Sequence, residues 1–389
     1  MHCGPNDPPA NTRRNTAPGS AMATMTVMTP RALNRALLAR QHLLARERTT
    51  PQRIVEQLAG LQAQIPRPPF IGLWTRLAQF ARRDLTERLH DRSIVRATMM
   101  RGTIHLMTAA DYLAFRPVLH AALVRGPESL FRRQLATLNH PQLVESGREF
   151  FARPNTFDAL RKHFAAANGP DVDARAPAYL VRMHVPLVQV PTGDPWAYPA
   201  SADFVLADDW LGTPVPTAPA PSHDLVRRYL AAFGPATPAD AQAWSGLQGL
   251  RAVFEELRPE LVTVRDERKR ELFDLPDAPR PDAETPAPVR FLPEYDNVVL
   301  GHKDRTRIID DAHRPLISTA NLQIRATYLV EGRVAGTWRV EKVRAAATLV
   351  LEPFGRLTKA VRAELEREVE DLLEFMEPAA AKKQIRLSA

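Results

Sequence analysis

The chain has 389 residues, of which 44% are hydrophobic, and it carries a formal net charge of +8 at pH 7. This length and composition are typical of a soluble protein of two or three domains, and the basic balance favours a polyanionic partner. The single cysteine, Cys3, excludes disulfides and thiolate metal clusters within the chain, so a reducing cytoplasm is expected. No stretch approaches the roughly 18 apolar residues of a membrane helix.

Residues 1–29 are rich in proline, asparagine, threonine and alanine and show neither a helical nor a strand period. They contain no apolar run long enough for the core of a secretory signal. We therefore expect a disordered extension, after which the folded part begins at Pro30.

Three successive units, residues 30–108, 109–220 and 221–285, repeat an order of helices, a turn, a further helix and a hairpin. Stripes of apolar residues and Thr-Pro helix starts, as at Thr50-Pro51 and Thr237-Pro238, support the helices. This order is typical of winged-helix domains, in which a helix-turn-helix is followed by a β-wing. The expected helices cover residues 30–46, 51–61, 70–80, 109–124, 156–166, 222–233 and 247–257, and the expected hairpins cover residues 94–107, 186–211 and 261–275.

A Pro-rich connector, residues 276–290, leads into a smaller C-terminal domain that covers residues 286–389. The stretch 358–375 predicts a closing amphipathic helix, and the tail from Pro378 is expected to be frayed. The predicted fold class is α+β, with about three tandem winged helix-turn-helix domains and a small β-rich domain. The strands expected in that domain cover residues 298–300, 321–330, 333–342 and 345–351, with Glu331-Gly332 as a hairpin turn.

Two glutamines, Gln62 and Gln64, lie one residue apart at the end of an apolar segment, in the sequence LQAQIPRPP. The prolines are expected to keep this stretch out of a helix, and Pro66 biases Ile65 toward an extended backbone. Residues i and i+2 of an extended chain point the same way, so both carboxamides can lie on one side. Alternatively, the two side chains cap the preceding helix by bonding its loose carbonyls.

Four runs of sequence together resemble the bacterial winged-helix DNA glycosylases of the AlkZ and YcaQ type. They are LNRALLARQHLLAR, GLQAQIPRPPFIGLWTRL, VRATMMRGTIHLMTAADY and FLPEYDNVVLGHKDRTRII. The resemblance extends from Pro30 to about Pro353, in the same order and with compatible spacing. It implies that Gln62-Ala63-Gln64 is the catalytic Gln-Φ-Gln motif. Gln64 alone assigns the AlkZ-like branch, because the YcaQ branch has aspartate there.

Amides at this position restrict the substrate. Hydrolysis of an N-glycosidic bond passes through an oxocarbenium-like sugar, so positive charge must be stabilised and a water placed on the anomeric carbon. Glutamine cannot take a proton at neutral pH, although its carbonyl can accept a hydrogen bond from water. Two carboxamides are therefore adequate chiefly for an activated leaving group. N3- or N7-alkylated purines carry a formal positive charge, and we expect them as substrates.

The first predicted wing contains Arg96, Met100, Arg101, Thr103 and His105, which are expected to contact DNA. Arg101 at the tip is expected to meet phosphate or the minor groove, and Met100 to press on the base stack. The alternative is a structural hairpin with alternate residues in the core. For His105, packing is the competing interpretation.

A second polar cluster follows the connector. Lys303, Arg305 and Arg307 are expected to bind phosphates. Glu294 or Asp296 is an auxiliary catalytic candidate if the glutamines prove insufficient. A metal held by His302 and Asp304 is disfavoured because a convincing ligand set is lacking. The cluster consists of Glu294, Tyr295, Asp296, Asn297, His302, Lys303, Asp304, Arg305 and Arg307.

The favoured hypothesis is a monofunctional, monomeric DNA N-glycosylase without cofactor or metal. It would remove alkylated purines from double-stranded DNA, including bulky adducts and interstrand crosslinks, in DNA repair or self-resistance. Because bulky lesions resist extrusion into a snug pocket, a shallow and open site is expected. The alternative is a non-catalytic winged-helix transcriptional regulator, which would usually dimerise to match two half-sites.

Overall fold

The computed structural model describes Met1 and residues 26–168, 173–216, 218–319 and 323–388. Its strands form two five-stranded sheets and one three-stranded sheet within these ranges. The strands are β1 Val27–Met28, β2 Leu61–Gln62, β3 Ile94–Thr98, β4 Ile104–Thr108, β5 Leu187–Gln189, β6 Phe204–Leu206, β7 Val262–Asp266, β8 Glu271–Asp274, β9 Arg290–Leu292, β10 Thr327–Val330, β11 Arg333–Val343, β12 Ala346–Pro353 and β13 Lys382–Leu387.

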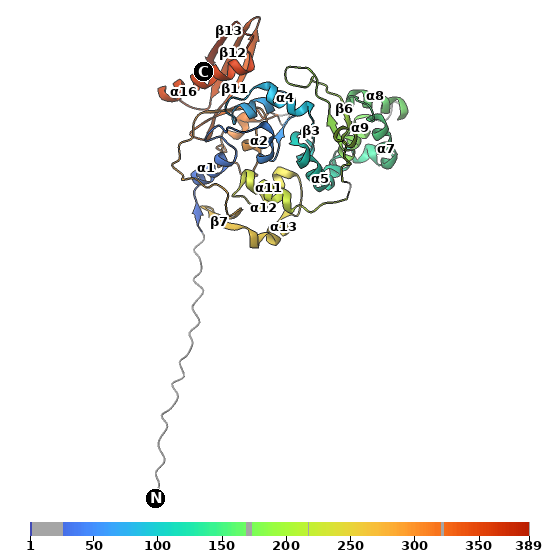
Figure 1. The fold of residues 1–389 in the computed structure, drawn as a ribbon, viewed down its shortest axis with the longest axis horizontal. Helices are drawn as coiled ribbons and strands as arrows, with labels where there is room; N and C mark the ends of the chain where they lie inside the picture. Colours follow the sequence, from blue (N-terminus) through green and yellow to red (C-terminus); the bar gives the residue numbers. More distant parts are fainter. Residues whose placement is uncertain (2–25, 169–172, 217, 320–322, 389) are drawn as a thin grey trace.

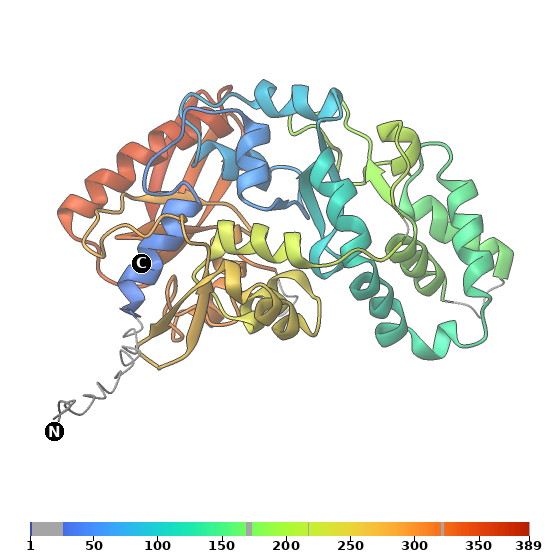
Figure 2. The same ribbon diagram turned by 60° about the horizontal axis from the view of Figure 1, so that its bottom comes forward.

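Helices surround and connect the three sheets. The C-terminal sheet with its long helix α16 lies at one end of the molecule, and α5 to α9 lie at the other end (Figures 1 and 2). The helices are α1 Pro30–Arg40, α2 Pro51–Gln57, α3 Pro68–Trp74, α4 Arg82–His90, η1 Met100–Gly102, α5 Ala109–Leu130, α6 Arg132–Leu135, α7 His140–Phe150, α8 Phe157–Asn168, α9 Arg175–His184, α10 Ala207–Leu211, α11 His223–Phe233, α12 Pro238–Ser245, α13 Leu250–Glu256, η2 Arg258–Glu260, α14 Asn297–Leu300, α15 Arg314–Ile317 and α16 Lys359–Met376.

The first unit follows the expected order, but its first three helices end earlier than predicted, α1 at Arg40, α2 at Gln57 and α3 at Trp74, and Leu61 lies in strand β2. Helix α3 begins at Pro68, so the prolines at its start do not keep the whole stretch out of helix; proline is compatible with the first helical turn because the N–H it lacks would have no partner there. Helix α4 was not predicted, since its sequence RRDLTERLH has only two apolar positions, Leu85 and Leu89, both of them buried.

The hairpin of β3 and β4 was predicted correctly. Ile94 pairs with Thr108 and Thr98 with Ile104 in antiparallel register. At the turn Gly102 has φ +69°, as expected, and Arg101 also has positive φ, +55°. Two successive positive φ angles give a turn whose twist matches that of the flanking strands.

The first two units share one sheet, in the order β2-β4-β3-β5-β6. Ala97 of β3 pairs with Val188 of β5, which joins the sheet across the boundary at residue 108. The hairpin expected over residues 186–211 is reduced to the short strands β5 and β6, which pair antiparallel. The structure thus mixes helices and strands as an α+β fold, while the number of winged-helix domains stays a prediction.

The third unit contains the predicted helix start at Pro238, where Thr237 caps α12 by accepting from the Asp240 N–H. The hairpin of β7 and β8 was also predicted, with Val262 paired to Asp274. Its outer edge is covered by β1, which runs parallel to β7. Val27 and Met28 are therefore ordered strand, contrary to the disordered extension expected for residues 1–29; residues 2–25 lie outside the described residues.

The C-terminal domain is β-rich as expected but differs in detail. Glu331 and Gly332 form the predicted turn between β10 and β11, with φ of +48° and +77°. The run Asn297–Leu300 is helix α14 and not a strand. The tail is not frayed, because β13 pairs parallel with β12 from Lys382 to Leu387.

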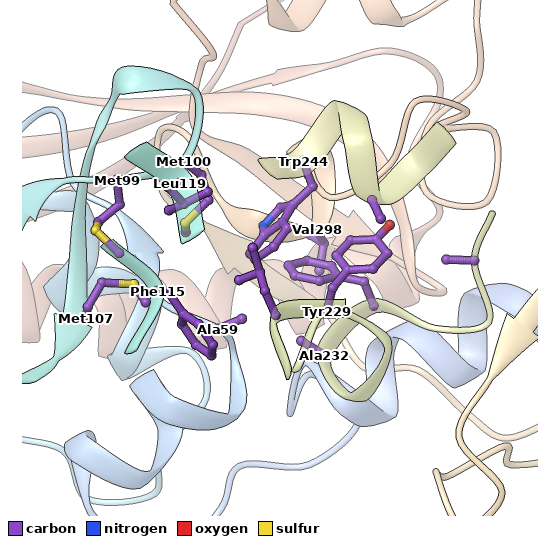
Figure 3. Packing of buried hydrophobic residues seen from close by; sticks show 14 of the residues in the cluster. Ala59, Met99, Met100, Met107, Phe115, Leu119, Tyr229, Ala232, Trp244 and Val298 are labelled. Carbon is purple, nitrogen blue, oxygen red and sulfur yellow. The ribbon is translucent and has the colours of Figure 1, made fainter. Parts of the chain in front are cut away.

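One apolar core connects the units that surround the hairpin. Figure 3 shows Met99 and Met100 of the hairpin, Phe115 and Leu119 of α5, and Trp244 of α12 within it. All five side chains are at most 4% exposed. The hairpin turn is consequently held from two sides, by α5 and by α12.

Candidate active site

The glutamine motif lies at an edge of the shared sheet. Helix α2 ends at Gln57, and Gly60, with φ +90°, turns the chain into β2. A Cβ at Gly60 would lie 2.3 Å from the Met107 sulfur, so only glycine fits this turn. Strand β2 pairs with β4, with Gln62 opposite His105.

Both amide oxygens of the motif accept hydrogen bonds from the hairpin. Gln62, which is 8% exposed, accepts at Oε1 from Arg101 Nη2 at 2.8 Å. Gln64 is exposed and accepts at Oε1 from the backbone N–H of Ile104 at 3.3 Å. The structure thus brings both amides to the hairpin. Neither caps a carbonyl of α2, which rules out the alternative of helix capping.

The guanidinium of Arg101 faces inward from the turn. It donates to Gln62 Oε1 and to the backbone carbonyl of Trp244, at the end of α12. Burial lowers the pKa of Arg101 to about 10, and the charge of Arg305 contributes in the same direction. Arg101 therefore remains cationic at neutral pH, and no carboxylate of the described residues pairs with it.

His105 is 2% exposed and lies on β4 directly opposite Gln62. Its Nδ1 is 3.1 Å from the Thr103 carbonyl oxygen, so a neutral ring donates there. Burial, followed by the charge of Arg101, lowers the pKa of His105 to about 3. The imidazole is therefore uncharged at neutral pH and cannot serve as a proton donor of ordinary strength.

The other hairpin residues expected to contact DNA have internal partners in this structure. Arg96 is 3% exposed and donates from Nε and Nη2 to the Ala63 carbonyl, at 2.9 and 2.6 Å. Met100 is 1% exposed, within the core, and the Thr103 hydroxyl donates to its carbonyl at 3.0 Å. Arg96 thus holds the middle residue of the motif.

Two carboxylates approach the motif from the C-terminal domain, and each is paired. Asp296 makes a two-pronged salt bridge with Arg76, with both distances 2.8 Å and both side chains 0% exposed. Glu294 accepts from Arg67 at 3.1 Å. Tyr295 lies between them with φ +62°. The ion pair of Asp296 and Arg76 ties the C-terminal domain to the segment that directly follows α3.

The three basic residues of this segment differ in their surroundings. Lys303 is exposed, and its side chain has no partner among the described residues. Arg305 is partly buried, with Nε lacking any hydrogen-bond partner in the described ranges. Arg307 is 5% exposed and donates to the Pro235 carbonyl at 2.9 Å. Only the first two remain available to a phosphate.

A pocket of about 490 Å³ opens beside the motif. Ile65, which directly follows Gln64, lines it together with Glu294, Tyr295 and Trp338. Ile65 is 41% exposed, so its side chain is an accessible part of the pocket wall. The pocket lies between the motif and the C-terminal sheet.

Sequence reasoning did not single out three arginines near the hairpin turn, Arg125, Arg132 and Arg133. All three are exposed, without an ion-pair partner in the part of the chain that the structure describes. A Cβ on Gly102 or on Gly126 would lie within 4 Å of the same Tyr179 hydroxyl, so this end of α5 adjoins the turn. The sequence shows these arginines, but only the fold places this end of α5 beside the hairpin turn.

No helix among the described residues is long and apolar enough to cross a membrane. Likewise, no group of three or more histidine, cysteine, aspartate or glutamate side chains in those residues could hold a metal ion.

Comparison with known proteins agrees with the resemblance seen in the sequence. The family described as DNA glycosylase AlkZ-like matches residues 55–375. An interstrand DNA cross-link repair glycosylase of Streptomyces sahachiroi is 26% identical over 341 residues, which cover 82% of this chain and 88% of the relative. The solved structure of Streptomyces sahachiroi DNA glycosylase AlkZ shares the fold, with a TM-score of 0.74 at 21% identity over 93% of this chain and all of that chain. Over most of its length, the chain belongs to the AlkZ-like family of DNA glycosylases.

Proposed function

We propose that the protein hydrolyses the N-glycosidic bond of cationic N3- or N7-alkylated purines in double-stranded DNA. The bond between C1′ and the purine nitrogen breaks, and its electron pair neutralises the base. Water adds to C1′ and releases one proton to solvent. The products are a neutral alkylpurine and an intact abasic site.

The observation that carries this proposal is that the motif offers amides only, and that no carboxylate of the described residues hydrogen-bonds to Gln62 or Gln64. Asp296 binds Arg76 with both oxygens, Glu294 binds Arg67 through Oε1 and leaves Oε2 without a hydrogen-bond partner, and His105 is uncharged at neutral pH. A neutral purine needs a proton to become a good leaving group, whereas an alkylated cationic purine does not. The surroundings of Gln62 and Gln64 therefore favour a substrate that is already activated.

Bulky adducts and interstrand crosslinks are the substrates that we propose within this class. The Streptomyces sahachiroi relative is described as an interstrand cross-link repair glycosylase. The pocket beside Ile65 lies at the protein surface and would accept a bulky group without its full extrusion into the interior. Repair or self-resistance against a DNA-alkylating agent would be the physiological use.

We propose that DNA is held by accessible cations on either side of the motif, all of them exposed except the partly buried Arg305. Arg125, Arg132 and Arg133 flank the hairpin turn on the side of α5, and Lys303 and Arg305 belong to the segment that follows α14. Each is suited to a phosphate, and phosphate contacts position a duplex without reading its sequence. Arg101, Arg96, Thr103 and His105 would act mainly through the motif. The comparisons give no support for a transcriptional regulator.

The proposal includes a monofunctional, monomeric enzyme without a cofactor. The motif supplies amides and no amine, so no Schiff base with C1′ can form there. Borohydride should therefore trap no covalent complex of enzyme and DNA during turnover, and the abasic strand should remain uncut. A trapped complex would contradict the monofunctional mechanism.

A substrate panel tests the charge dependence. Duplexes carrying 7-methylguanine or 3-methyladenine, which are cationic, would be compared with duplexes carrying hypoxanthine or 1,N6-ethenoadenine, which are neutral. We expect release of the cationic bases only. Equal rates for neutral lesions would show that the enzyme protonates its leaving group, and would overturn the proposed selectivity.

A further inference from the structure

The guanidinium of Arg101 determines which way the Gln62 amide faces. A guanidinium has only donors, so the group 2.8 Å from Nη2 must be the Gln62 carbonyl oxygen and not its nitrogen. The Gln62 nitrogen, which has no partner among the described residues, is left for the substrate. We infer that Arg101 is a positioning residue that presents the nitrogen of Gln62 to the damaged nucleotide, and that Gln64 supplies the carbonyl that holds the attacking water.

The two amides differ in how firmly their oxygens are held. The bond from Arg101 to Gln62 is short and charge-assisted, in a side chain that is 8% exposed. The bond from the Ile104 N–H to Gln64 is neutral, 3.3 Å long and on an exposed side chain. Charge-assisted hydrogen bonds are roughly twice as strong as neutral ones. Gln64 can therefore turn its oxygen toward water at small cost, whereas Gln62 cannot.

The fold fixes Arg101 before DNA arrives. Its backbone is in the left-handed region, and Gly246 packs against it, since a Cβ on Gly246 would lie 3.4 Å from the Arg101 backbone, in van der Waals contact. The second anchor of the guanidinium is the Trp244 carbonyl at the end of α12. No carboxylate of the described residues competes for it. The third unit thereby contributes to the geometry of a motif that lies in the first.

The Gln62 N–H, a hydrogen-bond donor, and the Gln64 carbonyl, an acceptor, can assist different parts of the reaction. An N–H cannot stabilise the sugar cation directly, but it can donate to an acceptor on the departing purine. The purine gains electron density as the glycosidic bond breaks, so this hydrogen bond strengthens in the transition state. Gln64, as acceptor, orients the water that adds to C1′. This inference rests on the proposed glycosylase function and assigns separate roles within it.

Exchange of each amide for a carboxylate tests the assignment. Gln62→Glu keeps an oxygen for Arg101 but removes the donor, so we expect its single-turnover rate constant for 7-methylguanine release to fall about 100-fold. Gln64→Glu keeps an acceptor and should stay within about 10-fold of wild type. The reverse order would overturn the inference. Absence of release by wild type would instead overturn the proposed function.

A double-mutant cycle tests whether Arg101 acts through Gln62. Arg101→Met should lower the rate constant by about 10- to 100-fold in the wild-type background and cause no further loss in Gln62→Ala. Binding to the lesion duplex should change by less than about 3-fold, because a positioning residue does not carry a phosphate contact. Additive losses, or loss confined to DNA affinity, would contradict the inference.

Two controls separate positioning from a general loss of stability. Arg116→Met removes another buried guanidinium bonded to a carbonyl, that of Met183 at 2.8 Å, and should leave the rate constant unchanged. If Arg101→Met fails to fold, Arg101→Lys retains a cation in the same turn. Added guanidinium should restore turnover to Arg101→Ala but not to Gln62→Ala, and failure of that rescue would count against the assignment.

Discussion

At the scale of single residues, the site is built from cations that bind carbonyl oxygens. Arg101 holds the Gln62 amide, Arg96 holds the Ala63 carbonyl, and Arg76 holds the Gln41 and Gly72 carbonyls together with Asp296. Desolvated guanidinium groups require such partners because an unpaired buried charge is costly. Arginines that sequence analysis assigned to DNA therefore also have a structural function within the protein.

Variants of Asp296, which is buried and paired with Arg76, can distinguish a stabilising role of this carboxylate from a catalytic one. Asp296→Ala leaves Arg76 buried without its carboxylate and should lower the free energy of unfolding by about 3–5 kcal/mol. Asp296→Asn retains the shape, and once folded it should release base at a rate close to wild type. Chemical denaturation and single-turnover assays measure the two effects. A folded Asp296→Asn protein without activity would make Asp296 the auxiliary catalytic carboxylate instead.

At the scale of elements, the sequence predicted those that carry local signals. The Thr237-Pro238 start of α12, the Glu331-Gly332 turn and the amphipathic helix α16 were all found. The run VVL, residues 298–300, was misassigned because three apolar residues fit a strand or a short helix equally well, and only the Asp296 cap decides for helix. Strand β13 was missed because its pairing with β12 is a tertiary contact.

The same limit applies to the site. Gln62 and Gln64 could be chosen from the sequence through the motif and the prolines that follow. The partner of Gln62 could not, because Arg101 is 39 residues away and reaches it across a strand pairing. Likewise, the sequence shows His105 but not that it faces Gln62 or that its pKa is lowered.

The C-terminal strand is expected to contribute to stability. Deletion of residues 382–389 would remove β13 and expose the edge of β12. It would also remove Ile385, which packs against the apolar core of the C-terminal domain. We expect a loss of about 2 kcal/mol in the free energy of unfolding and a greater tendency to aggregate, as for any newly exposed sheet edge. Thermal unfolding and light scattering measure both. An unchanged melting temperature would show that β13 is only loosely attached.

At the scale of the whole molecule, the sheets and helices join into one body around the hairpin. The C-terminal sheet and α16 lie at one end and α5 to α9 at the other, with β3 of the hairpin between them (Figure 1). The exposed arginines Arg125, Arg132 and Arg133 belong to α5 and α6, whereas α16 carries other exposed basic residues. Where DNA binds can therefore be tested by comparing variants that neutralise the arginines of α5 and α6 with variants that neutralise basic residues of α16.

Neutralisation of Arg125, Arg132 and Arg133 as glutamines should reduce the slope of log affinity against log salt by about 2–3, since each phosphate contact releases counterions. The rate constant at saturating enzyme should not change. The matched control is Lys359, Arg362 and Arg367 on α16, which are also exposed. If both triple variants lose affinity equally, the DNA-binding surface is not the one proposed.

Buried histidines predict acid sensitivity. The folded-state pKa of His105 is lowered to about 3, whereas the unfolded chain takes up a proton near its ordinary pKa of about 6.5. Below pH 6.5 the unfolded state therefore binds more protons, and stability falls as the pH falls, by up to about 1.4 kcal/mol per pH unit for this group. Urea denaturation between pH 7 and 5 should show this decline in the free energy of unfolding. In His105→Gln the slope of that free energy against pH should be smaller, by the equivalent of about one bound proton. An identical slope in the variant would contradict a neutral buried His105.

The central claim is that two amides remove cationic purines from DNA. The most direct measurement is release of 7-methylguanine from alkylated duplex DNA, together with unhooking of an N7-linked crosslink, by wild type and by the Gln62→Ala, Gln64→Ala double variant. We predict release and unhooking by wild type and a loss of both in the variant, with DNA binding retained. Release by the double variant at the wild-type rate, or no release by wild type beside tight binding to one particular sequence, would contradict the account.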